Sequence, residues 1–237
     1  MVDNIHPASG HGQITQGIIP NTLVEQTVEF VRNELPRWRD HSDRPLESSE
    51  ERLNSQLCDF LDTQARQDFP MVRFHHEQKQ TRDRRVDLAA KLIEGGFIGT
   101  AYHSIYDPFL VFEGKRLPAP NKDREREYVR GSTKATGGIQ RFKLGLHGAK
   151  FEVAVMIGYV QDGTPILWHD RINSWICQLT AGPPLDGEAW DIQEQLTDLV
   201  DDVTAKTARL NSVHPREGDG VSASIRLYHL WIVMTVK

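Results

Sequence analysis

Two short segments of the chain place carboxylates beside a lysine in an arrangement suited to phosphoryl chemistry. Asp87 stands inside the apolar run of residues 86–89, and Glu113 and Lys115 follow directly on the apolar run of residues 109–112. In an extended chain residues i and i+2 point to the same face, so Glu113 and Lys115 project together. Carboxylate oxygens are ligands for hard cations such as Mg²⁺ or Mn²⁺, and a nearby lysine neutralises charge that develops on phosphorus.

A third carboxylate precedes these segments on an expected helix. Glu50 lies three and seven residues before Leu53 and Leu57 and shares their inward face, whereas Glu51, the alternative, is rotated away. The expected metal ligands are Glu50, Asp87 and Glu113. An isolated buried Asp or an isolated Glu-x-Lys tripeptide is usually structural, so the prediction depends on their occurring together.

The elements that must position these residues follow from hydrophobic periodicity and from capping and breaking residues. Helices are expected at residues 22–35, 48–66, 139–146, 171–179 and 189–210. Strands are expected at residues 71–77, 85–91, 109–117, 151–160 and 222–236. The chain is expected to form a single α/β domain. Residues 1–47 are expected to form an arm and a helix packed on the core, residues 48–160 the core, and residues 161–237 the rest of the same domain.

The order of these elements matches a known pattern. With Asp on the second of three strands and Glu-x-Lys on the third, residues 48–160 resemble the core of the PD-(D/E)XK, restriction-endonuclease-like nuclease superfamily. The resemblance implies a core of a helix, three antiparallel strands, a helix and a strand, with added N- and C-terminal helices and a C-terminal strand. Residues 112–117 and 128–131 are also similar to nuclease-like proteins of bacterial mobile-element and phage-defence loci.

The resemblance also implies roles for individual residues. Asp87 and Glu113 would bind the metal, Lys115 would be the catalytic lysine, and Gln140 on the following helix would support the site. The implied activity is that of a metal-dependent endonuclease that hydrolyses DNA phosphodiester bonds with Mg²⁺ or Mn²⁺, in phage defence or restriction. The alternatives are a catalytically silent nuclease fold that binds nucleic acid or a partner protein in a defence complex, and an RNA nuclease. Assembly into a homodimer is left open.

Basic residues are concentrated in one part of the chain. The 237 residues carry a net charge of −5, but residues 113–150 hold ten Lys or Arg against four Asp or Glu. A polyanion-facing surface on an acidic body would show this asymmetry, and scattering of the same residues in space is the alternative. The residues expected to contact phosphates are Arg116, Arg130, Arg141 and Lys143.

Composition and missing motifs exclude several classes of protein. Cys58 and Cys177 lie far apart without a metal-ligand spacing, which favours a reducing compartment. The apolar runs are shorter than the roughly 20 residues of a membrane span, and residues 1–12 lack a signal-peptide pattern, so a cytoplasmic protein is expected. The sequence has no nucleophile elbow, P-loop, dinucleotide fingerprint or zinc-protease motif. The neighbours His75 and His76 would face opposite sides of a strand.

One further motif lies near the end of the chain. In an extended segment Ser212, His214 and Arg216 point to one face. They could contact phosphate or shuttle protons beside the metal site. A surface turn before the last strand is the favoured interpretation, since polar residues often mark turns.

Overall fold

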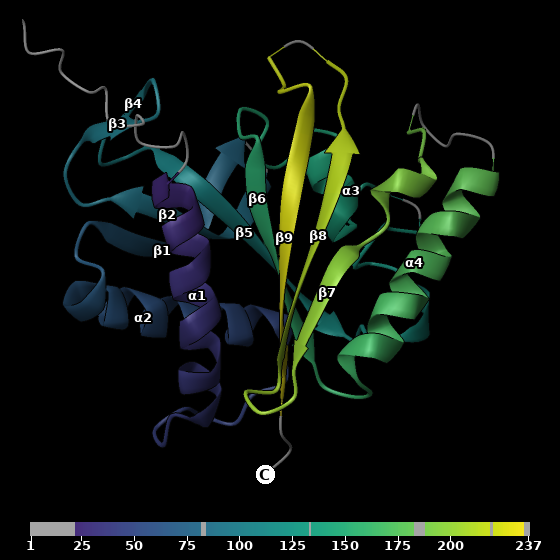
Figure 1. Cartoon of the computed structure of the whole chain (residues 1–237), viewed down its shortest axis with the longest axis horizontal. Coiled ribbons are helices and arrows are strands. Elements are labelled where there is room, and N and C mark those ends of the chain that lie inside the picture. Colours follow the sequence, from purple (N-terminus) through teal and green to yellow (C-terminus); the bar gives the residue numbers. More distant parts are fainter. Residues whose placement is uncertain (1–21, 82–83, 133, 183–187, 219, 235–237) are drawn as a thin grey trace, which may run out of the picture.

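A seven-stranded mixed sheet forms the centre of the computed structural model, which describes residues 22–81, 84–132, 134–182, 188–218 and 220–234 (Figure 1). The strands of this sheet are β1 (Val72–Thr81), β2 (Arg84–Leu92), β5 (Pro108–Leu117), β6 (Val153–Val160), β7 (Thr197–Asp202), β8 (Thr207–Pro215) and β9 (Ser224–Val233). A separate hairpin is made by β3 (Gly96–Ile98) and β4 (Ala101–His103). The helices are α1 (Thr22–Asp40), α2 (Glu50–Asp68), α3 (Gly138–Lys143) and α4 (Pro165–Ala181), with short 3-10 turns η1 (Lys122–Arg124) and η2 (Ile192–Glu194).

The strands lie in the order β1-β2-β5-β6-β9-β8-β7 across the sheet. β5, β6 and β9 run parallel to one another, and the other neighbouring pairs are antiparallel. The predicted α/β class is therefore confirmed, with a sheet that is mostly antiparallel. All five predicted strands are present, with ends that differ by a few residues.

Alternating side chains of the central strands feed two hydrophobic layers. Leu88 and Phe112 face α1 and α2, where α2 buries the predicted stripe of Leu53, Leu57 and Leu61. The intervening side chains of the same strands pack on the other face, against α3 and α4. In Figure 1, α2 crosses the β1–β2 end of the sheet and α4 lies beside β7. A residue's position along a strand thus decides which layer it joins.

The first helix is longer than its proline suggests. Pro36 was expected to end the helix, but α1 continues through it to Asp40. A proline inside a helix costs about 3 kcal/mol because it removes a backbone hydrogen bond. The extra turn offsets this cost, since Trp38 is buried against Tyr159 and Arg39 Nη1 donates to the carbonyl of Ala205 at 2.8 Å.

The predicted helix over residues 189–210 is wrong. This segment forms η2, β7 and the start of β8. Val200 and Val203, which the apolar face of such a helix would bury, are 51% and 78% exposed. The helix-like spacing of apolar residues in this segment arises because a 3-10 turn is followed directly by a β-hairpin. In β8 the burial period is two, since Ala208, Leu210, Ser212 and His214 are buried and the residues that follow each of them are more exposed.

Two other elements depart from the expectations. The helix predicted at residues 171–179 starts earlier, because Thr164 caps it by accepting the Leu167 N–H at 3.3 Å and Pro165 occupies its first position. The β3–β4 hairpin lies in a stretch where no strand was predicted. None of the helices in the described part of the chain combines the length and apolar character needed to cross a membrane.

Candidate functional site

The site lies where β2 separates from β5. The ladder between these strands ends at the pair Leu88–Phe112, and continuing that register by one residue sets Asp87 opposite Glu113. At this point the Asp87 side chain enters between the strands, and its Oδ2 accepts the backbone N–H of Gly114 at 2.8 Å. The carboxylate thereby replaces a strand carbonyl as the partner of that N–H. The end of the ladder is what brings the two predicted carboxylates together.

Glu113 is fully buried and surrounded by nitrogen atoms. Its Oε1 lies 2.9 Å from Lys115 Nζ and 2.7 Å from Arg141 Nη1. Its Oε2 lies 3.2 Å from His147 Nδ1, but neither of these two atoms makes a hydrogen bond. Burial raises the pKa of Glu113, but the neighbouring nitrogens, first among them Lys115, outweigh burial and hold that pKa well below its usual range.

Lys115 is the centre of the carboxylate cluster. Its Nζ donates to Glu50 Oε1 at 2.7 Å and to the Gly114 carbonyl at 3.1 Å, in addition to its contact with Glu113. Burial lowers the pKa of Lys115, but the carboxylates, led by Glu113, outweigh burial and raise that pKa above its usual value. The ammonium group is therefore protonated at neutral pH. It can donate hydrogen bonds and neutralise charge, and it is not available as a base.

Asp87 has the opposite electrostatic character to Glu113. Burial, followed by the nearby Glu113 charge, raises the pKa of Asp87 to about 8, although Lys115 acts in the opposite direction. At neutral pH the Asp87 carboxyl is thus largely protonated when the protein is alone. A cation bound between the two carboxyl groups would displace this proton, because it would supply the positive charge that the pair lacks.

The donor set fits a magnesium-type ion better than a zinc-type ion. The described residues contain no group of three or more His, Cys, Asp or Glu side chains arranged to hold a metal. Two carboxylates are nevertheless what Mg²⁺ commonly uses, since it keeps several waters and takes other oxygens from a phosphate substrate. Glu113 Oε2, buried without a hydrogen bond, is an oxygen available for such a contact.

Glu50 is close to the pair but is engaged differently from the prediction. Its Oε1 accepts from Lys115 Nζ, and its Oε2 accepts the backbone N–H of Arg116 at 3.3 Å. The structure therefore makes Glu50 a residue that positions Lys115, whereas the sequence predicted a metal ligand. The preference for Glu50 over Glu51 is supported by this contact, because α2 starts at Glu50 and directs its side chain to β5.

Gln140 is not part of the carboxylate cluster. Its Oε1 accepts the backbone N–H groups of Gly131 and Gly137 at 3.0 and 3.3 Å, and its Nε2 donates to Glu188 Oε2 at 2.7 Å. These bonds attach the loop before α3 to α3 itself. The geometry gives Gln140 a role in shaping this loop, and its predicted catalytic role has no support in these contacts.

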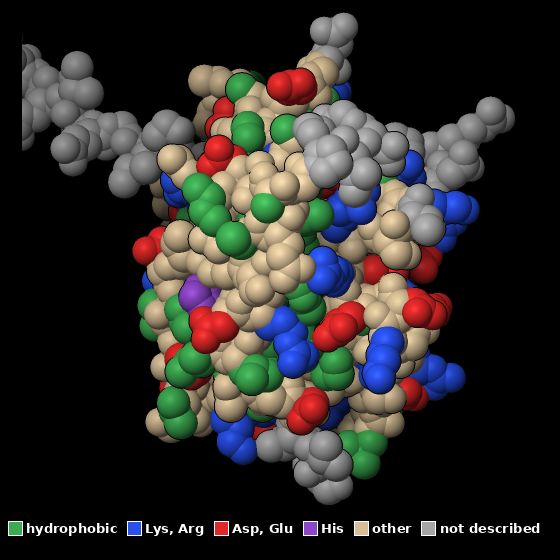
Figure 2. All heavy atoms as spheres, turned by 90° about the vertical axis from the view of Figure 1, so that its right-hand side faces the viewer, with side chains coloured by type: hydrophobic (Ala, Val, Ile, Leu, Met, Phe, Trp, Pro, Cys, Tyr) green, Lys and Arg blue, Asp and Glu red, His purple; other side chains and the backbone are tan. Residues whose placement is uncertain are grey.

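The four basic residues expected to contact phosphates have different surroundings. Arg116 Nε bonds Gln161 at 2.8 Å, Arg130 Nε lies 3.4 Å from Glu188, and both side chains are partly exposed. Arg141 is held by Glu113. The prediction for Lys143 is wrong, because its side chain is buried and its Nζ bonds Glu194 at 2.7 and 2.8 Å. On the face shown in Figure 2, Lys and Arg side chains alternate with Asp and Glu, so basic charge is mixed with acidic charge on that face.

A second polar cluster, which we call the buried chain, lies under α3. Its members are Lys143, Glu194, His214, Ser212, His229, Tyr128 and Trp231. Each successive contact is 2.7–2.8 Å, and all seven residues are less than 10% exposed.

The donors and acceptors along the buried chain determine which atom carries each proton. Trp231 can only donate, so its N–H goes to the Tyr128 oxygen, and the Tyr128 O–H goes to His229 Nδ1. His229 Nε2–H then donates to Ser212, whose hydroxyl proton goes to His214 Nε2. His214 Nδ1–H donates to Glu194. This direction satisfies every group while both imidazoles are neutral.

All three side chains of the Ser212, His214 and Arg216 motif are buried, so the motif is neither a surface turn nor a phosphate contact. Proton shuttling by this motif stays a prediction. Arg216 donates to several backbone carbonyls, among them Phe142 at the end of α3 and Gly148 after it. The motif fastens α3 and the loop that carries His147 to β8.

Two residues of the site were missed in the sequence. His147 follows α3 and reaches Glu113 only through the fold, so no local pattern identifies it. Asn54 lies on the buried face of α2, and its Oδ1 accepts the hydroxyl of Tyr159 at 2.7 Å. A Cβ placed on Gly114 would lie 2.0 Å from this Oδ1, which explains the glycine between Glu113 and Lys115. A fully buried Asn within an apolar helix stripe was a signal that could have been recognised.

Known proteins give no family assignment for this chain. Comparison with protein-family models finds no match, and comparisons with curated proteins and with solved structures find none either.

Proposed function

We propose that this protein is a metal-dependent nuclease that hydrolyses phosphodiester bonds, with DNA as the expected substrate. The observation that carries the proposal is the meeting of Asp87, Glu113 and Lys115 at the point where β2 leaves β5. The sequence of elements α2, β1, β2, β5, α3 and β6, with β5 parallel to β6, agrees with the restriction-endonuclease-like core that the resemblance implies. Function is nevertheless argued from the site, because one fold serves many activities.

Each side chain has a distinct task in this proposal. Asp87 and Glu113 would hold Mg²⁺ or Mn²⁺, which when bound polarises a phosphoryl oxygen and favours ionisation of water. Lys115 holds its proton and would turn one of its three N–H groups from a present partner to the attacking water or to the charged phosphoryl oxygens. Glu50 fixes the Lys115 ammonium group from the other side. Arg141 fixes the Glu113 carboxylate.

A second candidate is a nuclease fold without activity, used to bind nucleic acid or a partner protein in a defence complex. The enclosure of Glu113 favours it, because two cations and His147 already surround the carboxylate. In this alternative the Glu113 cluster is a structural ion-pair network, and the cations leave no need for a metal.

Cleavage assays with and without divalent metal distinguish the active nuclease from the silent fold. The protein is incubated with supercoiled plasmid, linear duplex, single-stranded DNA and RNA, each with Mg²⁺, Mn²⁺ or EDTA. We expect cleavage of DNA with either ion, no cleavage with EDTA, and no cleavage by Asp87→Asn. Cleavage of RNA alone would assign an RNA nuclease. Binding without cleavage under every condition would favour the silent fold, and cleavage that persists in EDTA would overturn the metal assignment.

A further inference from the structure

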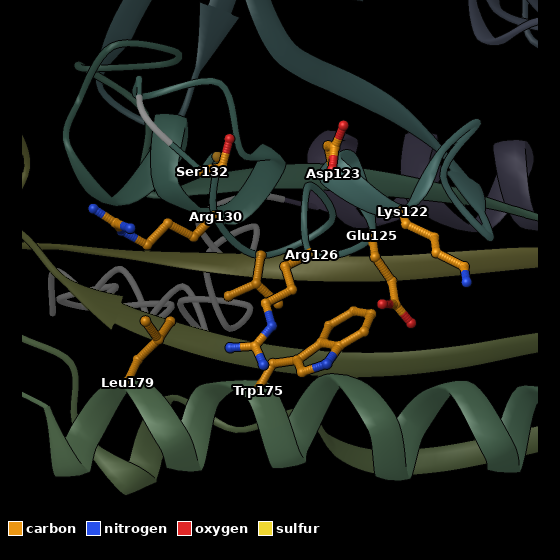
Figure 3. A pocket seen from close by; sticks show the side chains of 10 residues that line it. Lys122, Asp123, Glu125, Arg126, Arg130, Ser132, Trp175 and Leu179 are labelled. Atoms are coloured by element: carbon orange, nitrogen blue, oxygen red, sulfur yellow. The ribbon is translucent and has the colours of Figure 1, made fainter.

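A pocket of about 250 Å³ lies between the loop that follows β5 and helix α4 (Figure 3), and its lining includes no residue of the carboxylate cluster. The loop contributes charged side chains, backbone and the Ser132 hydroxyl to the lining, and α4 contributes the apolar side chains Trp175 and Leu179. The lining residues used below are Lys122, Arg126, Arg130, Val129, Trp175 and Leu179. The volume is below the roughly 300–1,000 Å³ of pockets that enclose drug-sized ligands. It suits one small unit of a longer molecule better than a free cofactor.

Three cationic side chains, Lys122, Arg126 and Arg130, line this pocket together with the acidic Asp123 and Glu125. Lys122 and Arg126 are exposed, and no described residue forms an ion pair with either. Arg126 extends towards Trp175 in Figure 3, and its Nη2 donates to Gln178 on α4 at 2.8 Å. Asp123, which also lines the pocket, points away from Trp175 in the same view. The guanidinium of Arg126 is thus held in place by a neutral partner and keeps its charge for a ligand.

The acidic side chains of the loop are largely occupied. Glu125 lies 3.7 Å from Arg171 Nη1, and Glu127 is paired with Arg124 at 2.5 Å. These pairs reduce the repulsion that an approaching anion would meet. In the structure Glu125 and Glu127 have cationic partners, whereas Asp123, Lys122 and Arg126 form no ion pair with a described residue.

The base of the pocket is apolar, and only an edge of Trp175 reaches it, since Trp175 is 6% exposed and Val129 is buried. Trp175 and Leu179 lie one turn apart on α4, and Val129 faces them from the loop. Cationic groups above an aromatic surface are the combination that binds single-stranded nucleic acid, where the backbone contacts charge and the base or sugar contacts the ring. A simple inorganic anion would use the cations but not the apolar base.

The position of the pocket relates it to the carboxylate cluster. The loop begins at the end of β5, the strand that carries Glu113 and Lys115, and Arg124 in η1 lies within electrostatic reach of Glu50. We infer that this pocket binds one nucleotide of the nucleic-acid strand whose phosphodiester bond is cleaved, with its phosphate at Lys122 and Arg126 and its sugar or base against Trp175. This inference rests on the proposed function and adds to it a second contact that aligns the strand.

Binding measurements test the pocket separately from cleavage. A fluorescently labelled single-stranded DNA is titrated with Asp87→Asn protein, with and without Arg126→Ala, over a series of salt concentrations. We expect Arg126→Ala to weaken binding about tenfold at low salt and to reduce the salt slope by about one unit, as for one lost phosphate contact. Arg66→Ala is the matched control, because Arg66 is an exposed arginine on α2, paired with Asp62 on the same helix. This control should bind like the parent protein.

The outcomes separate the two proposals. If cleavage occurs but Arg126→Ala and Arg66→Ala bind equally well, the pocket assignment is wrong and the nuclease proposal stands. If Arg126→Ala loses affinity while no condition gives cleavage, the pocket stands and the nuclease proposal fails. In an active protein Arg126→Ala should raise KM with little change in kcat. Circular dichroism that matches the parent protein shows that the variants are folded, and an absence of nucleic-acid binding by the parent protein overturns the pocket.

Discussion

Gly114 is a backbone position on which three side chains of the site depend. Its N–H holds Asp87, its carbonyl accepts from Lys115, and the space above its Cα is filled by Asn54. A side chain at position 114 would contact the Asn54 amide, which Tyr159 holds by a hydrogen bond. Close packing on both sides of this strand therefore requires glycine, although its neighbours carry the chemistry.

We expect Gly114→Ala to destabilise the fold by about 1–3 kcal/mol, the usual cost of an added methyl group in a well-packed core. Urea unfolding followed by circular dichroism measures the change. Gly96→Ala is the matched control, because a Cβ at Gly96 would meet only Leu92 at an ordinary 3.5 Å. Equal midpoints for the two variants would show that Asn54 moves aside at no cost.

Lys115 and Glu50 should differ in their effect on cleavage. In the proposed nuclease, Lys115→Met removes a charge-stabilising donor and should reduce cleavage by at least 10²–10³-fold. Glu50→Gln keeps Lys115 but loosens one of its contacts, so a smaller loss is expected. Initial rates of plasmid nicking give both values. A larger loss in Glu50→Gln than in Lys115→Met would mean that Glu50 acts on the metal or substrate directly.

At this scale local spacing explains the pairing of Glu113 with Lys115, and the resemblance supplied Asp87 and the helix Glu, whereas the contacts of Glu113 with Arg141 and His147 were not predicted. Glu113 and Lys115 are two apart on one strand, so their common direction is a property of the extended chain. The partners Arg141 and His147 come from α3 and the loop after it, and nothing near them in the sequence refers to Glu113. Lys143 was misplaced because a basic residue is exposed on average, and only the fold supplies its buried partner.

Among the elements, α3 is small but strongly attached. Its six residues direct Gln140 to the preceding loop, Arg141 to Glu113 and Lys143 to Glu194. A helix of this length has little stability of its own in water. Its orientation must therefore come from these polar attachments and from the buried side chains Ile139 and Phe142. The position of Arg141 over Glu113 depends on all of them.

Breaking the Lys143–Glu194 pair should be costly. Lys143→Met leaves a buried carboxylate without its cation and should destabilise the protein by about 3–5 kcal/mol. The double variant Lys143→Met, Glu194→Gln removes that charge and should lose less than the sum of the two single changes. Unfolding midpoints in urea measure the cycle.

An exposed ion pair provides the control for this cycle. Arg66→Met removes the partner of Asp62 on the surface of α2, where a pair contributes about 0–1 kcal/mol. A Lys143→Met variant as mild as Arg66→Met would show that Glu194 is adequately satisfied by His214 and by the Asp191 N–H, which it accepts at 2.9 Å.

The sequence predicted an element correctly where one hydrophobic period runs through the whole element. The prediction was wrong where a segment spans two elements. The stripe of α2 and the apolar run of β6 each belong to one element and were predicted correctly. Residues 189–210 contain a 3-10 turn, a strand and a tight turn, whose combined apolar spacing imitates a helix. The prediction that the first helix ends before Pro36 was wrong for another reason. Tertiary contacts of Trp38 and Arg39 outweigh the local preference of proline to end a helix.

Across the whole molecule, the buried chain makes stability depend on pH. Burial is the main cause that lowers the pKa of His214 and the pKa of His229, the latter well below its usual value. In the unfolded chain both would bind protons near pH 6.5, so the unfolded state gains protons first as the solution is acidified. Stability should therefore be fully present above about pH 6.5 and fall as pH decreases below it.

This prediction is best measured in Asp87→Asn protein. The raised pKa of Asp87 has the opposite effect, because its folded form takes up a proton that the unfolded form lacks between about pH 8 and pH 4. With Asp87 removed, the free energy of unfolding from urea titrations should fall by up to about 1.4 kcal/mol per pH unit for each buried histidine below pH 6.5. His41→Asn, at an exposed position, should leave that slope unchanged. A flat profile between pH 7 and pH 5 would show that the buried chain accepts protons without breaking.

The central place of β9 has a consequence for synthesis on the ribosome. β9 is the last of the seven strands to be made, yet it lies between β6 and β8 and pairs with both along most of its length. Until residues 224–233 have left the exit tunnel, a nascent chain has two half-sheets with open edges, and β6 lacks the neighbour that covers its backbone groups. Open strand edges bind other chains. During this interval a nascent chain therefore avoids aggregation only if it rarely meets another chain or if a chaperone binds it. The outer strand of the β7–β8 half carries Asp198, Asp201 and Asp202. These charges oppose pairing with other chains until β9 has been made.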